Sequence, residues 1–69
     1  MAIKHWDCSS GSRVSRPDVD AFVSDILKVC RKHRMTLAHE DDHGSFVILG
    51  PDYSYARMLL NTAIIGDKV

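Results

Sequence analysis

The sequence has little of what usually reveals the function of a small protein. Its 69 residues include only two cysteines, Cys8 and Cys30, whereas a secreted disulfide scaffold carries four or more at close spacing. The longest apolar run is residues 46–49, far short of the roughly 20 residues that span a bilayer. We therefore predict a reduced protein of the cytoplasm, without a membrane span and with Cys30 in its core.

A net charge of either sign is also missing. Nine basic residues balance nine acidic ones, whereas domains that bind nucleic acid by electrostatic attraction carry a clear basic excess. This balance argues against nucleic acid as a partner. The charges are unevenly spread, however: residues 1–34 hold seven basic and four acidic side chains, and residues 35–69 hold two and five. Such a molecule can be steered toward a charged partner or toward a copy of itself.

Catalytic motifs are absent from the sequence as well. It contains no phosphate-binding loop, dinucleotide fingerprint, nucleophile elbow or zinc-finger spacing. A chain of this length forms one domain near the lower limit of independent stability. We therefore expect a protein that is not an enzyme and that uses no cofactor.

The first 16 residues and the remainder of the chain differ in composition. Ser and Gly gather at residues 9–12, a composition typical of flexible loops. We expect residues 1–16 to form an N-terminal arm with Trp6 packed against the rest of the protein. The alternative is that the first five residues form an edge strand. Residues 17–69 then form the single domain.

The strongest local pattern predicts a helix over about residues 16–33. Pro17 suits the first turn, Ser15 can cap it, and the basic residues 31–34 complement the negative end of the helix dipole. Apolar residues recur at steps of three and four, which makes one continuous helical stripe. The stripe consists of Val19, Phe22, Val23, Ile26, Leu27 and Cys30.

A β-hairpin is predicted after this helix. Residues 35–39 alternate, and residues 45–49 are rich in β-branched and aromatic side chains. The polar residues 40–44 between them form a turn, in which Gly44 can take a positive φ. The second strand has apolar side chains on both faces of the hairpin, and two helices can cover only one of these faces well.

A second helix is predicted between Asp52, which can cap it, and Gly66, a natural glycine for its C-terminal end. Its core stripe consists of Ala56, Leu59, Leu60, Ala63 and Ile64, and Tyr53, Tyr55 and Met58 widen the apolar arc beyond one face. The expected fold is therefore α+β: a compact helix–β-hairpin–helix (αββα) domain, completed by homodimerisation. The alternative is a monomer whose N-terminal arm covers the open face of the hairpin.

The run His39-Glu40-Asp41-Asp42-His43 matches the H-E-x-x-H motif of zinc metalloproteases. That motif works on a helix, where both imidazoles face one zinc ion. Here it lies in a predicted turn, so we expect no catalytic or metal site, and a looser metal site at His39, Asp42 and His43 is the weaker alternative. Neighbouring like charges raise carboxylate pKa values and favour a cationic partner, although Asp41 or Asp42 can also merely cap the turn.

The candidate binding residues lie in this turn and on the second helix. Large aromatic side chains are candidate anchors, because they dominate the energetics of interfaces. As an alternative, a dimer can hold a nucleotide at its seam through Arg31, Arg34, Arg57 and the tyrosines. The candidate residues are His39, Glu40, Asp41, Asp42, His43, Tyr53, Tyr55, Arg57 and Met58.

Two signatures, His39-Glu40-Asp41 after the helix and then Gly44-Ser45-Phe46, carry a resemblance. Over about residues 20–62 the chain resembles small conserved phage and prophage accessory proteins of unknown function. The resemblance implies a protein made inside a bacterial host that acts by binding, and we expect a modulator or inhibitor of a host protein. Such relatives often carry Gly or Asn at the position of Arg34, so we expect Arg34 itself to adopt the left-handed conformation that ends the helix.

Overall fold

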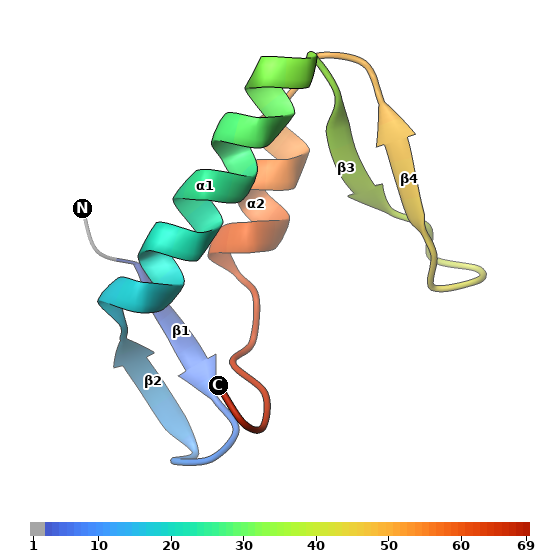
Figure 1. The fold of residues 1–69 in the computed structure, drawn as a ribbon. Helices are drawn as coiled ribbons and strands as arrows, with labels where there is room; N and C mark the ends of the chain where they lie inside the picture. Colours follow the sequence, from blue (N-terminus) through green and yellow to red (C-terminus); the bar gives the residue numbers. More distant parts are fainter. Residues whose placement is uncertain (1–2) are drawn as a thin grey trace.

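The computed structural model describes residues 3–69, which contain two helices and two small antiparallel sheets (Figure 1). The α+β class is confirmed, and so is the central order of helix, hairpin and helix. The elements along the chain are β1 (Lys4–Asp7), β2 (Ser12–Ser15), α1 (Pro17–His33), β3 (Thr36–His39), β4 (Phe46–Leu49) and α2 (Ser54–Asn61).

Helix α1 begins where predicted, but its cap differs. Pro17 occupies the first turn, whereas the N-cap is Arg16 in an extended conformation, with no side-chain cap hydrogen bond. The prediction of a Ser15 cap is therefore wrong. Asp18 instead pairs with the Arg16 guanidinium and accepts the Val19 N–H at 2.9 Å. The hydrogen bond from Arg16 is the main reason that the pKa of Asp18 is lowered.

The C-terminal end of α1 confirms the expectation for Arg34. Its φ and ψ are 57° and 37°, in the left-handed region. Its N–H donates to the Arg31 carbonyl at 3.3 Å, and the Met35 N–H donates to the Cys30 carbonyl at 3.1 Å. These bonds satisfy carbonyls that a helix end otherwise leaves unpaired, but a residue with a Cβ is strained in this conformation.

The core lies where α1 packs against α2 and β3. Val23, Leu27 and Ala56 form its buried centre, and Cys30 is buried as a free thiol, as predicted. On β3 the buried side chains are Thr36 and Ala38. The side chains that alternate with them therefore point to the other face of the hairpin.

The register of this hairpin assigns its two faces. The strands pair antiparallel, with Leu37 opposite Ile48 and His39 opposite Phe46. Directly opposite residues share a face, so these four side chains lie on the face away from the buried Thr36. That outer face is open: Phe46 and Ile48 are 72% and 69% exposed.

The predicted N-terminal arm is a β-hairpin over its described part. β1 and β2 pair antiparallel, with Lys4 opposite Ser15. His5, not the expected Trp6, is the buried side chain: Trp6 is 48% exposed and His5 only 2%. The His5 Nδ1 hydrogen-bonds the Ala63 carbonyl at 2.7 Å, which ties this hairpin to the C-terminal segment.

Helix α2 is shorter than predicted. It ends at Asn61 rather than near Gly66, and at this end the Thr62 hydroxyl donates to the Met58 carbonyl at 2.8 Å. Ile65 forms a parallel bridge to β1 instead, with its N–H on the Trp6 carbonyl at 2.8 Å. This long-range pairing removes Ala63 and Ile64 from the predicted helical stripe.

The prediction that Asp52 caps α2 is wrong, because the N-cap is Tyr53, without a side-chain cap hydrogen bond. Asp52 lies one residue earlier. Its carboxylate accepts the Ser54 backbone N–H at 3.2 Å and the Ser54 hydroxyl. Both bonds lower the pKa of Asp52, the hydroxyl bond more strongly. Neither helix in residues 3–69 combines the length and apolar character needed to cross a bilayer.

Figure 1 shows the β1–β2 hairpin at the N-terminal end of α1, whereas the β3–β4 hairpin lies beside the helices and joins the C-terminal end of α1. The alternative in which the N-terminal arm covers the open face of the β3–β4 hairpin is therefore wrong. The cause is the pairing of β1 with the segment around Ile65, which holds the first hairpin beside the C-terminal segment.

Candidate functional site

The predicted turn, residues 40–44, joins β3 to β4 and is called the acidic turn below. The Glu40 N–H donates to the Ser45 carbonyl at 2.8 Å, and the Gly44 N–H donates to the Glu40 carbonyl at 3.0 Å. Gly44 has a φ of 70°, which glycine adopts without strain. The backbone of the turn is thus closed by its own hydrogen bonds.

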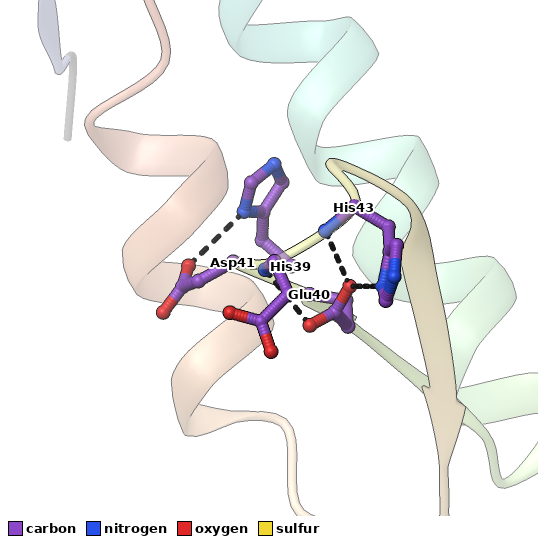
Figure 2. Close-up of polar contacts among 5 residues, drawn as sticks. His39, Glu40, Asp41 and His43 are labelled. Carbon is purple, nitrogen blue, oxygen red and sulfur yellow. Dashed lines mark hydrogen bonds and ion pairs between the residues drawn. The ribbon is translucent and has the colours of Figure 1, made fainter.

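The Glu40 side chain organises the inside of this turn (Figure 2). Its carboxylate accepts the backbone N–H groups of Asp42 at 2.9 Å and His43 at 2.7 Å, and it pairs with the His43 Nδ1 at 2.8 Å. These contacts, with the Asp42 N–H bond the largest cause, lower the pKa of Glu40. The expected rise from neighbouring carboxylates is therefore wrong for Glu40, and Glu40 takes the capping role that was expected of Asp41 or Asp42.

The two histidines of the H-E-x-x-H run do not converge. The His39 Nδ1 lies 3.3 Å from an Asp41 oxygen, whereas His43 pairs with Glu40 (Figure 2). In residues 3–69 no group of three or more His, Cys, Asp or Glu side chains is arranged to hold a metal ion. The turn presents each imidazole beside a different carboxylate, as an exposed polar loop.

The second group of predicted residues lies on α2. Tyr53 is partly buried at the N-cap, and Tyr55, Arg57 and Met58 are exposed. In the described part of the chain, no hydrogen bond or ion pair joins these four side chains to the acidic turn. The structure therefore holds the candidate residues 39–43 together at the acidic turn but leaves the α2 residues as a separate surface.

An apolar surface that the sequence analysis did not single out lies between α1 and the outer face of the β3–β4 hairpin. This surface contains a groove of about 400 Å³. One wall of the groove consists of Phe22, Ile26 and Val29 of α1, and the other wall consists of side chains of the β3–β4 hairpin. Phe46 continues the surface, because it lies two residues from Ile48 on the same strand face. We call this surface the apolar face; it consists of Phe22, Ile26, Val29, Met35, Leu37, Phe46 and Ile48.

The sequence contains a signal for the apolar face, but we interpreted the apolar residues of the helix as one continuous stripe. At 100° per residue, Phe22, Ile26 and Val29 lie to one side of Val23 and Leu27. The helix therefore carries two adjacent stripes, of which only the second is buried in the core. Phe22 is 66% exposed, whereas Val23 is 9% exposed.

Charged groups of opposite sign lie at the two ends of the β3–β4 hairpin. The acidic turn lies at one end, and residues 31–34, here called the basic helix end, lie at the other, where α1 joins β3 (Figure 1). Within residues 3–69, no ion pair is formed by Arg31, Lys32, Arg34 or Asp42.

Comparison with known proteins found no family model, no curated protein and no solved structure that matches this chain.

Proposed function

We propose that this chain is a non-enzymatic protein-binding module that uses the apolar face. On the strength of its resemblance to phage accessory proteins, we further propose that it acts in the cytoplasm of a bacterial host, as a modulator or inhibitor of a host protein. The observation that carries the binding function is the apolar face itself, where large apolar side chains gather without cover.

The size of this surface supports a protein partner. A large aromatic side chain contributes about 150–250 Å², so two exposed phenylalanines, with Val29, Met35 and Ile48, amount to an area on the order of 600 Å². Stable protein interfaces bury about 800 Å² per partner, and the largest apolar patch of a typical monomer is about 300–600 Å² and is often functional. The apolar face has the dimensions of an interface core.

The chemistry of the groove favours a protein over a nucleotide. A nucleotide phosphate needs cationic donors that converge on one site. Within residues 3–69, the lining of the groove includes none of Arg31, Arg34 and Arg57. The groove walls on α1 are apolar apart from Asp25 and His33.

Capture of host proteins from a bacterial lysate tests the function. The immobilised chain is compared with Ile48→Gln on the apolar face and with Ile64→Gln as a matched control, since Ile64 is similarly exposed, at 64%, outside the apolar face. We expect a specific host protein to be retained by the wild type and by Ile64→Gln and to be lost with Ile48→Gln. Equal retention by all three, or none above background, contradicts the proposal.

A further inference from the structure

We propose that the apolar face binds a second copy of this chain, with the two β3–β4 hairpins antiparallel. This inference rests on the proposed function in using the same binding face, and it names one occupant of that face. The reasons are the arrangement of charge along the hairpin and the self-complementary character of the surface.

Charge is separated along the hairpin by its own geometry. A strand rises about 3.3 Å per residue, so the four residues of each strand hold the acidic turn and the basic helix end on the order of 13 Å apart. The basic end carries Arg31, Lys32 and Arg34, and the turn carries Glu40, Asp41 and Asp42. The apolar side chains of the hairpin lie between these two ends.

In a twofold-symmetric dimer, this separation of charge can make the facing ends of the two hairpins complementary in charge. In a symmetric dimer the same surface packs on itself. If the hairpins run parallel, acidic turn meets acidic turn, and like charges repel. If they run antiparallel, each acidic turn lies beside the basic helix end of the other copy, so that both pairs of ends are attractive. The charge pattern therefore selects the antiparallel arrangement.

The apolar residues fit the same arrangement. Phe46 lies near the acidic turn and Met35 near the basic helix end, so reversal of one hairpin places these two kinds of side chain against each other. Each copy contributes an apolar area on the order of 600 Å², compared with the roughly 800 Å² that each partner buries in a standard interface. Burial of this area also adds apolar contacts to a domain whose own core centres on three side chains.

Self-association and host binding are linked through this shared surface. A host protein that binds the apolar face competes with the second copy, so dilution of the chain favours the host complex. The two proposals nevertheless fail separately. A chain that is monomeric at all concentrations can still show host capture that depends on Ile48.

Solution mass is the first test, measured by light scattering of the full chain from 1 to 200 µM. We expect a concentration-dependent rise from the monomer mass of 7.7 kDa to twice that value. Ile48→Gln should raise the dissociation constant on the order of tenfold or more, and the matched Ile64→Gln should leave it unchanged. A wild type that stays monomeric, or a dimer that Ile48→Gln leaves intact, overturns the inference.

A charge swap tests the antiparallel arrangement. Asp42→Lys and Arg34→Glu each place like charges together in the dimer, and each should raise the dissociation constant roughly threefold to tenfold, the effect of two exposed ion pairs. The double variant restores opposite charges and should return the constant to near the wild-type value. Both side chains are exposed, and circular dichroism checks that each variant is folded. Additive rather than compensating effects in the double variant rule out the antiparallel arrangement.

Discussion

At the scale of single residues, Glu40 shows how one side chain can define a loop. Its carboxylate holds two backbone N–H groups and one imidazole, and these contacts lower its pKa below the ordinary value of 4.5. The neighbouring Asp42 side chain, by contrast, has no ion pair in the described residues. The sequence predicted the place of the turn but could not predict which of three adjacent acids would fold inward.

The lowered pKa of Glu40 predicts that the order of the turn depends on pH. Stabilisation by the carboxylate is complete above the ordinary pKa of 4.5 and is lost as the pH falls below this value through the lower pKa of the folded state. Amide resonances of Asp42 and His43, followed by NMR, should shift together over that range. Glu40→Ala should abolish this titration at both amides, and Asp42→Ala should preserve it at His43; an unchanged titration in Glu40→Ala contradicts this role.

The left-handed conformation of Arg34 predicts a stabilising glycine. Glycine adopts φ near 57° without the steric cost of a Cβ, which is about 1–2 kcal/mol, although it also gains entropy in the unfolded chain. Arg34→Gly should therefore raise the free energy of unfolding by about 0.5–1 kcal/mol, measured by urea denaturation. Arg31→Gly, inside the last turn of α1, should lower it by a similar amount. A destabilised Arg34→Gly would falsify the account of this cap.

Thr36 predicts a second stabilising change. This residue is 2% exposed, and its buried hydroxyl has no hydrogen-bond partner among the described residues. Thr36→Val keeps the shape and removes the unpaired group, so it should raise the free energy of unfolding by about 1 kcal/mol. Thr62→Val is the control: its hydroxyl is bonded to the Met58 carbonyl, so removal should bring no such gain. A loss of stability in Thr36→Val counts against this assignment.

At the scale of elements, local patterns predicted α1 and the β3–β4 hairpin because their signals are contained in the segment itself. Helical spacing, Pro17 and the turn glycine each act over a few residues. The end of α2 was mispredicted for the opposite reason, because Ile65 pairs with Asp7, far away in the sequence. The β1–β2 hairpin is itself local. Its Ser and Gly residues were interpreted as a flexible loop, whereas Gly11, with a φ of 65°, donates its N–H to the Asp7 carbonyl and closes a turn.

The link between β1 and the C-terminal segment predicts the effect of losing His5. His5→Ala removes a buried ring and leaves the Ala63 carbonyl without its 2.7 Å hydrogen bond, which should lower the free energy of unfolding by about 1–3 kcal/mol. His33→Ala, an exposed histidine on α1, should change stability by less than about 0.5 kcal/mol. Urea denaturation compares the two, and equal effects would contradict the buried role of His5.

At the scale of the whole molecule, composition indicated an excess of apolar surface but not its location. We predicted this excess on the second helix and on the second strand. Phe46 and Ile48 are indeed exposed, but the larger apolar surface pairs them with Phe22 of α1. The packing of α2 and β3 decides which of the two adjacent apolar stripes of α1 is buried. The spacing of apolar residues in the sequence does not specify that choice.

The central claim is that the apolar face binds a second copy of this chain. An isotope-filtered NOE experiment on an equal mixture of labelled and unlabelled chain tests it most directly, because only contacts between copies give signals. We predict signals that join Phe22, Val29 and Ile48 of one copy to the apolar face of the other, and that join residues near Asp42 to residues near Arg34. Signals confined to Tyr55 and Met58 on α2, or no signals at millimolar concentration, would contradict the account.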